Sequence, residues 1–394
     1  MDTSNHLEDQ PSQANLDPVR QEKAKEYGRI KRRLMLVDML MVGLYTIAWL
    51  FPSSQLFGEQ SLRASATLRD ILYGITTNEW LVVAGFMLVF GGIYSLLTIP
   101  LAYYSGFILP HRYDLSTQTL PGWMVDQVKG LVVGGFIGLI VIQVIYALLR
   151  LTPDLWWLWV AGVMLVFNVV LANLGPVLLL PIFYKLAPLD QERPDLVERL
   201  TKLAERAGTR VRGVYKFDMS RRTKAANAAL TGLGNTRRII LGDTLLQEFR
   251  DDEIETVLAH ELAHHVHKDI PLGMLVGSVM TLGGLYLASL GINWGVQTFG
   301  FLGVDDVAAF PILMIVMGIF GLVTMPLQNG FSRWRERRAD DYALMVTGKK
   351  EAYASALTRL ANQNLAEIDP EPWVEILLMS HPPLGKRIRM AENY

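Results

Sequence analysis

The chain has 394 residues, a hydrophobic fraction of 51% and a formal net charge of −1. The absence of cysteine excludes disulfides, thiolate metal ligands and a cysteine nucleophile, so any bound metal must use His, Asp or Glu side chains. The near-neutral charge gives no reason to expect a nucleic-acid partner, whereas the gathering of apolar residues into long runs indicates a lipid bilayer.

The N-terminal residues 1–28 are polar and charged. They lack the apolar core and the small-residue cleavage site of a signal peptide, so we expect no cleavable signal and interpret the first apolar run as a retained signal anchor. The first dozen or so residues, MDTSNHLEDQPSQ, are expected to be disordered.

Several apolar runs are long enough, or nearly so, to cross a bilayer as helices, which takes about 20 residues. The first contains Asp38 and is the weakest candidate. The fourth is interrupted by Asn168, Asn173, Pro176 and Pro181, so we expect it to bend. The six runs are residues 34–52, 80–102, 130–149, 155–184, 271–293 and 307–327.

Basic residues flank these runs unevenly. A cluster at residues 29–33 precedes the first run, and SRWRERR follows the sixth. The positive-inside rule then places both termini and the polar blocks 185–270 and 328–394 in the cytoplasm. Arg63, Arg69 and Arg150 are exceptions, because they fall in loops expected on the other side.

The first polar block combines helix and strand patterns. An amphipathic stretch at residues 193–207 ends at Gly208 and predicts a helix. The runs VRGVYKF and RRIILGD, with AANAALTG between them, predict a small antiparallel sheet. A further helix is expected to begin at Asp251 or Asp252, where acidic side chains suit the helix dipole.

That last helix contains His260, Glu261 and His264 in an H-E-x-x-H pattern. Side chains four apart share one helix face, so two imidazoles can bind one metal ion while the glutamate lies beside a metal-activated water. The bare pattern also fits a helix with surface histidines. Apolar Leu258 and Leu262 indicate instead that the helix is partly buried, where His and Glu need partners.

A catalytic zinc needs a third protein ligand. His267 shares the face of the other two histidines but lies roughly 10 Å along the axis from His260, too far for one ion. We therefore interpret His265 and His267 as surface or membrane-interface residues.

Glu336 and Asp340, four apart on a predicted helix, are better candidates. Glu336 can bind the metal while Asp340 accepts a hydrogen bond from a ligand histidine. The alternative is a solvated helix on which both acids pair with Arg333 and Arg337. Spacing alone leaves both interpretations open.

Several separate stretches resemble peptidase family M48, of the CAAX prenyl protease (Ste24) type. In the second half these are DMSRR leading into AANAALTGLGNTRRIILGDTLL, then HELAHHVHKD, NGFSRWRERRAD and SHPPLGKRI. In the first half they are QEKAKEYGRIKRRL and IPLAYYSGFILPHRYDLSTQTLPGWMVDQVKG. The resemblance covers nearly the whole chain from about residue 20.

This resemblance implies a mainly α protein, a polytopic membrane helical bundle of about six spans enclosing a chamber, with a gluzincin-like zinc protease domain that contains a small β-sheet. We expect a polar N-terminus at residues 1–28, a membrane domain of four spans at 29–184, and a protease domain at 185–394 that includes the spans 271–293 and 307–327. One Zn²⁺ per chain is implied.

The resemblance also implies roles for individual residues. Glu336 becomes the third ligand beside His260 and His264, and Glu261 the general base. Asp340 is assigned a supporting or proton-donor role, and His381 matches a histidine that stabilises the oxyanion, although a His before two prolines can also cap a helix. Asn227 matches a residue that binds the substrate backbone, or is a turn amide; Arg387 is a structural partner or binds a substrate carboxylate.

The sequence departs from the family pattern at a few places. Ala263 stands where the family often has Gly, and Ala229 where it often has an aromatic residue; the second change could alter a subsite. Eukaryotic members have an additional N-terminal span without a counterpart here.

The implied partners are peptide or protein substrates, prenylated or membrane-embedded ones among them. The expected location is the plasma (inner) membrane of a prokaryote or the endoplasmic reticulum membrane of a eukaryote, with the catalytic site facing the cytoplasm. For a prokaryotic member, we expect a role in quality control of damaged or misfolded membrane proteins. The alternatives are an HtpX-type quality-control protease and a non-catalytic transporter or scaffold, against which the complete residue set argues.

Overall fold

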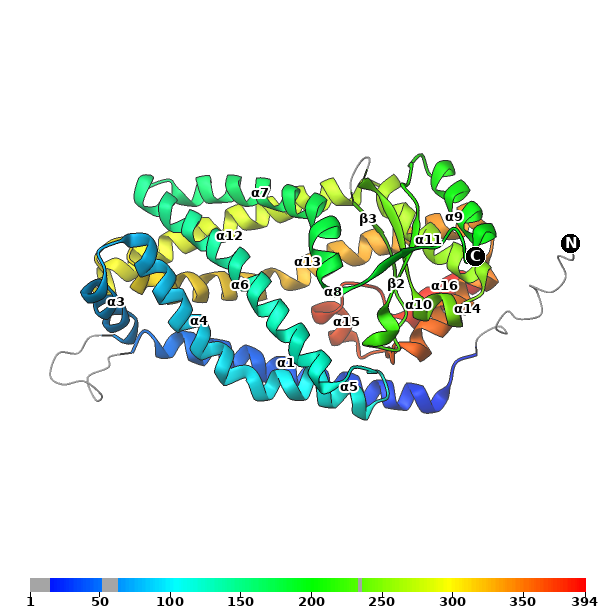
Figure 1. Cartoon of the computed structure of the whole chain (residues 1–394), viewed down its shortest axis with the longest axis horizontal. Helices are drawn as coiled ribbons and strands as arrows, with labels where there is room; N and C mark the ends of the chain where they lie inside the picture. Colours follow the sequence, from blue (N-terminus) through cyan, green and yellow to red (C-terminus); the bar gives the residue numbers. More distant parts are fainter. Residues whose placement is uncertain (1–14, 52–62, 233–235) are drawn as a thin grey trace, which may run out of the picture.

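Long helices and a small sheet form the two halves of the molecule. The computed structural model describes residues 15–51, 63–232 and 236–394. The long helices run along its length, and the sheet lies at one end among shorter helices (Figure 1). The disorder expected for the first dozen residues lies outside the described residues.

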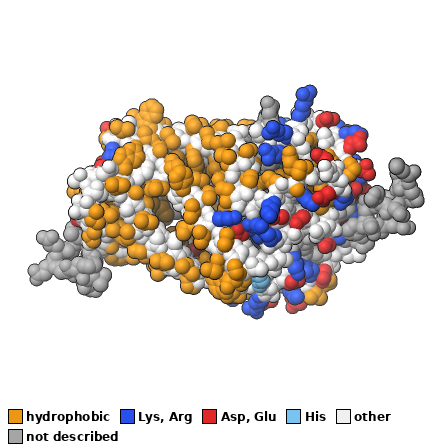
Figure 2. All heavy atoms as spheres, viewed as in Figure 1, with side chains coloured by type: hydrophobic (Ala, Val, Ile, Leu, Met, Phe, Trp, Pro, Cys, Tyr) orange, Lys and Arg blue, Asp and Glu red, His pale blue; other side chains and the backbone are white. Residues whose placement is uncertain are grey.

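Five helical stretches are long and apolar enough to cross a membrane. The most apolar window of the third has none of its side chains buried inside the protein, so they face outward, as lipid contact requires. Figure 2 shows the same division, with hydrophobic side chains over the long helices and charged ones gathered over the sheet end. The five stretches are Glu79–Arg112, Leu120–Leu151, Trp156–Phe183, Asp269–Phe299 and Val307–Thr347, and they correspond to the last five runs predicted from the sequence, of which 155–184 extends one residue beyond its stretch at each end.

The helices of the first half include two short π-helical turns that continue a span without ending it. The second of these contains Pro176, which produces the predicted interruption in this span. The elements are α1 (Pro18–Ala48), α3 (Ala64–Ile75), α4 (Glu79–Tyr103), η1 (Tyr104–Ile108), α5 (Leu109–Arg112), α6 (Leu120–Leu151), α7 (Trp156–Leu174), η2 (Gly175–Leu179) and α8 (Leu180–Phe183).

Helix α1 crosses the boundary expected at residue 28, because the polar segment and the first apolar run form one continuous helix. Its apolar part is interrupted by Asp38, which accepts a hydrogen bond from the Tyr94 hydroxyl at 3.3 Å. The Tyr45 hydroxyl donates to the Phe90 carbonyl at 2.5 Å, so α1 packs along α4. Its basic cluster and Asp38 keep α1 out of the five stretches above, and a span at residues 34–52 stays a prediction.

The arginines that break the charge rule have partners at the end of the molecule away from the sheet. Arg69 forms an ion pair with the buried Asp306. Arg63 donates to the Phe299 carbonyl at 2.6 Å and lies over the Phe299 ring. Both arginines therefore tie α3 to the segment that joins the last two spans, which accounts for their place in these loops.

The second half contains the sheet and the helices around it. Its elements are β1 (Leu186–Pro188), α9 (Pro194–Arg206), β2 (Val214–Phe217), η3 (Met219–Arg221), β3 (Ala228–Thr231), β4 (Arg238–Gly242), α10 (Asp243–Glu248), α11 (Asp251–Val266), α12 (Asp269–Phe299), η5 (Val307–Ala309), α13 (Phe310–Thr347), α14 (Lys350–Gln363), α15 (Pro372–Leu378) and α16 (Leu384–Glu392). The helices predicted from Arg193 and from Asp251 are both present.

The four strands lie in the order β1-β2-β4-β3. The antiparallel arrangement predicted for VRGVYKF and RRIILGD is wrong, because β2 and β4 pair in parallel, with Val214 opposite Ile239. Strand β3 pairs antiparallel with β4 and forms one edge of the sheet. An alternating pattern identifies a strand and its buried face but not the direction of its neighbour, which is why the sequence missed this pairing.

Helix α11 is anchored at its first turn and along its apolar face. The buried Glu253 carboxylate accepts hydrogen bonds from the Arg250 backbone N–H at 2.8 Å and from the Ser355 hydroxyl at 2.6 Å, which join α11 to α14. Leu258 and Leu262 are fully buried. The helix that carries the H-E-x-x-H residues is therefore fixed in the interior of the protease half.

Replacing Leu258 by Ala should destabilise the protein by about 2–5 kcal/mol, because the change removes buried methyl groups and leaves a cavity. The measurement is thermal unfolding of the purified protein in detergent. Leu131→Ala is the matched control, since Leu131 is 64% exposed on α6 and should change little. Equal unfolding midpoints for the two variants would contradict the placement of α11 in the core.

Candidate metal centre and active site

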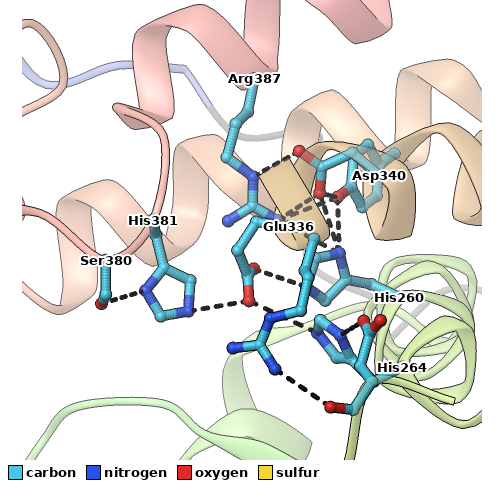
Figure 3. Close-up of polar contacts among 10 residues, drawn as sticks. His260, His264, Glu336, Asp340, Ser380, His381 and Arg387 are labelled. Carbon is cyan, nitrogen blue, oxygen red and sulfur yellow. Dashed lines mark hydrogen bonds and ion pairs between the residues drawn. The ribbon is translucent and has the colours of Figure 1, made fainter. Parts of the chain in front are cut away.

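Two histidines of α11 and one glutamate of α13 point toward a common centre (Figure 3). One ligand atom from each of His260, His264 and Glu336 lies within 4.8 Å of the others. His260 Nε2 is 3.1 Å from Glu336 Oε2, and His264 Nε2 is 3.5 Å from Glu336 Oε1. The sequence left two interpretations of Glu336 open, metal binding or an ion pair with a neighbouring arginine. This geometry corresponds to the first, because the carboxylate faces the histidines.

The other ring nitrogen of each histidine contacts a separate carboxylate. His260 Nδ1 is 2.8 Å from Asp340 Oδ1, and His264 Nδ1 is 2.8 Å from Asp269 Oδ2. An ionised carboxylate only accepts hydrogen bonds, so each Nδ1 donates to its carboxylate, and the Nε2 atoms are the ring nitrogens that face the centre and would supply their lone pairs to a metal ion. Such carboxylate–histidine pairs orient metal-binding imidazoles.

Asp269 is a residue that sequence reasoning missed. It is five positions from His264, a spacing that does not share a helix face. The contact arises because Lys268 adopts a left-handed conformation (φ 56°) that turns the chain between α11 and α12. The one available signal was the acidic residue that closes HELAHHVHKD, which carries no meaning until the turn is known.

Asp340 is enclosed by a hydrogen-bonded network. Arg387 donates to both carboxylate oxygens, with Nε 2.9 Å from Oδ2 and Nη2 2.6 Å from Oδ1, and the Tyr353 hydroxyl donates to Oδ1 at 2.5 Å. A buried carboxylate is stable only with such partners. Of the two roles that the sequence left open for Arg387, these contacts correspond to the structural one.

The electrostatics of the centre favour positive charge. Burial would lower the pKa of His260, but its hydrogen bonds to Asp340 and Glu336 outweigh burial and raise the pKa to about 9. An environment that stabilises an imidazolium also stabilises a metal cation at the same place. Burial raises the pKa of the neighbouring Glu261, and no hydrogen bond or ion pair engages its carboxylate within residues 15–51, 63–232 and 236–394.

The remaining candidates fall into two groups. His381 Nε2 lies 3.4 Å from Glu336 Oε1, although 57% of the His381 side chain is exposed. Asn227 is exposed and directly precedes the edge strand β3, and α11 packs against this strand. His265 and His267 lie outside the cluster. His265 Nε2 is 3.2 Å from Arg237 Nη1, and the His267 ring contacts Tyr342.

The donor set fits a metal ion. Two imidazole nitrogens and a carboxylate converge, each supported from behind, and such a three-ligand set leaves a coordination position for water. Combined with the spans, these features define a membrane-embedded metallopeptidase. Residues 190–394 match the family model described as "Peptidase family M48", and residues 5–185 match "CAAX prenyl protease N-terminal, five membrane helices". The chain therefore belongs to peptidase family M48, in its CAAX prenyl protease-like branch.

Individual relatives agree with this assignment. The chain is 31% identical over 319 residues to "Uncharacterized metalloprotease YhfN" of Bacillus subtilis, with 80% of this chain and 74% of the relative covered. It is 30% identical over 327 residues to "CAAX prenyl protease 1" of Saccharomyces cerevisiae, covering 77% and 70%. The fold resembles the crystal structure of S. mikatae Ste24p, with a TM-score of 0.81, 22% identity and coverage of 98% and 92%.

The chain is thus an integral, multi-pass membrane metalloendopeptidase that acts on peptide or protein substrates. The first half of the chain matches the CAAX prenyl protease N-terminal model. This match favours the CAAX prenyl protease-like assignment over an HtpX-type protease, a transporter or a scaffold.

Glu336→Ala and His264→Ala should each abolish stoichiometric metal binding, because two remaining ligands hold an ion poorly. The measurement is metal content of the purified protein by mass spectrometry. His265→Ala, one position further along α11, is the control and should keep its metal. Unchanged metal content in both ligand variants would refute the site.

Asp269→Asn should weaken metal affinity on the order of 10–100-fold, because the amide no longer favours the Nδ1-protonated form of His264. Competition with a chromophoric chelator measures the change. The control is Asp341→Asn, which alters an exposed carboxylate beside Asp340. Equal affinities in the two variants would remove Asp269 from the site.

Proposed function

We propose that the metal is zinc, bound by His260, His264 and Glu336, and that the protein uses it to hydrolyse peptide bonds. The observation that carries this proposal is the convergence of these three side chains beside Glu261. Two histidine nitrogens and one glutamate oxygen form a ligand set that catalytic zinc sites use. When bound, zinc would polarise the scissile carbonyl and lower the pKa of a water molecule.

Glu261 is the general base in this proposal. It directly follows His260 in α11, and burial raises the pKa of its carboxyl group, which strengthens it as a proton acceptor. Glu261 takes the proton of the attacking water and then passes it to the leaving amine. The lack of a competing partner for its carboxylate in the described part of the chain supports this role.

His381 supports the oxyanion, and its nearness to Glu336 favours this role. Asp340 acts as a positioning residue in the proposal and not as a proton donor, because it contacts His260 at the nitrogen opposite the centre and is 1% exposed. Arg387 holds Asp340 in place.

The substrate backbone adds to the sheet beside β3. This strand pairs with β4 on one side, no strand among the described residues pairs with its other edge, and Asn227 directly precedes it. Edge strands bind extended peptides through main-chain hydrogen bonds, to which the Asn227 amide can add. Ala229 lies within β3, where a small side chain leaves room at the adjoining subsite.

The substrate class is a peptide or protein associated with the membrane, including prenylated C-terminal segments. Support comes from relatives named CAAX prenyl protease 1 and from the joining of the site to membrane spans. The basic cluster at residues 29–33 favours a site that faces the cytoplasm. The host membrane is the prokaryotic plasma membrane or the eukaryotic endoplasmic reticulum, and in a prokaryote damaged membrane proteins become the substrates.

The test compares three peptides with the purified protein: a quenched general peptide, a prenylated C-terminal peptide, and the same sequence without its prenyl group. Wild type should cleave, and Glu261→Gln should retain the metal but lose on the order of 10²–10⁴ in rate. Preference for the prenylated peptide would support prenyl processing, and equal cleavage of all three would favour general degradation. Full activity in Glu261→Gln would remove the proposed base.

A further inference from the structure

Arg333 belongs to SRWRERRAD, three positions before Glu336, and an ion pair between it and the nearby acids was one of the two interpretations that the sequence left open. The structure shows a different partner. Arg333 Nη1 donates to the main-chain carbonyls of Glu375 at 2.7 Å and Met379 at 2.6 Å, and more weakly to Ile376 at 3.4 Å. The guanidinium thus connects α13 to a segment more than forty residues further along the chain.

These carbonyls lie at the end of helix α15, where the last carbonyls of a helix have no partner within the helix. A cation at a helix C-terminus satisfies such groups and complements the helix dipole. Asn329, one turn earlier on α13, donates a further hydrogen bond from its side-chain amide to the Leu377 carbonyl at 2.6 Å. Two polar side chains of α13 therefore hold the end of α15.

Packing alone does not fix this segment. Val374 is the one buried residue of α15, and Trp373 and Ile376 are 49% and 54% exposed. A short helix with one buried side chain has little apolar burial to hold it in place. Its position depends accordingly on polar contacts, namely the hydrogen bonds from Arg333 and Asn329 and the ion pair between Glu375 and Lys386 of α16 at 2.7 Å.

His381 lies two residues after Met379, whose main-chain carbonyl is the last one that Arg333 binds. The imidazole is itself largely exposed, and Ser380 Oγ contacts its Nδ1 at 3.0 Å. On the other side, Pro382 and Pro383 lead directly into α16, whose Arg387 binds Asp340. The backbone around His381 is thus held from both sides by residues tied to α13.

We propose that Arg333, assisted by Asn329, is a positioning residue for His381. The same helix carries Glu336, so one rigid element sets both the metal ligand and the backbone from which the imidazole reaches toward it. This inference rests on the proposed role of His381 in stabilising the oxyanion. A displacement of about 1 Å at such a group is enough to lower a rate on the order of 100-fold.

The experiment measures kcat, KM and metal content for Arg333→Gln in the full chain. We expect kcat to fall about tenfold to a hundredfold with KM within about twofold and metal content unchanged. Arg333→Lys should recover part of kcat, because an ammonium group can still donate to these carbonyls. Arg337→Gln is the matched control, since Arg337 is exposed on the same helix, and should behave as wild type.

A double-mutant cycle with His381→Ala separates positioning from a general structural effect. If Arg333 acts through His381, Arg333→Gln should cost less than about twofold in the His381→Ala background. An undiminished loss in that background would overturn the positioning role while leaving the proposed function intact. Wild-type kcat in His381→Ala would instead refute the proposed role of His381, and the inference with it. Should Arg333→Gln fail to fold, Asn329→Ala replaces it in the same cycle, because this variant removes the hydrogen bond to the Leu377 carbonyl.

Discussion

Two imidazoles of α11 and one carboxylate of α13 can share an ion only if these helices pack closely, and small side chains make that approach possible. Ala259 and Ala263 on α11 and Ala339 and Ala343 on α13 are all fully buried. The separation of packed helices depends on the side chains at their contact, and alanine leaves little between the backbones. Ala263, a departure from the family's frequent glycine, keeps this small size.

The close approach brings several charges into the interior, which is unfavourable unless each has partners. The structure satisfies this requirement in pairs: Asp340 with His260 and Arg387, and Asp269 with His264. Glu336 faces both histidines from the third side. A metal cation held by His260, His264 and Glu336 would complete this arrangement, because it would offset the negative charge of the carboxylates and leave in place the hydrogen bonds that hold the rings from behind.

Local patterns predicted the parts of this arrangement that depend on neighbours in the sequence. The spacing of His260 and His264 defined one helix face, and the five later apolar runs correspond to the five candidate spans. Contacts between distant segments were not predictable from spacing. The partner of Arg333 lies near residue 377, the partner of His264 follows a left-handed turn at Lys268, and the parallel pairing of β2 and β4 joins strands separated by β3. Spacing alone allowed two roles for Glu336, and only the family resemblance implied that it is the third ligand. The enclosed chamber and the division at residue 184 remain predictions.

The metal centre and the membrane helices share continuous elements. Glu336 lies on α13, the same helix that forms the stretch Val307–Thr347, and Asp269 is the first residue of α12. The other ends of α12 and α13 pack with α4 and α7 in a separate apolar core that includes Phe86, Trp156 and Ile292. Helices transmit a change of position along their length because interiors are close-packed. Any rearrangement of the spans that admits a substrate from the bilayer must therefore either leave α12 and α13 in place or move the carboxylates that define the site.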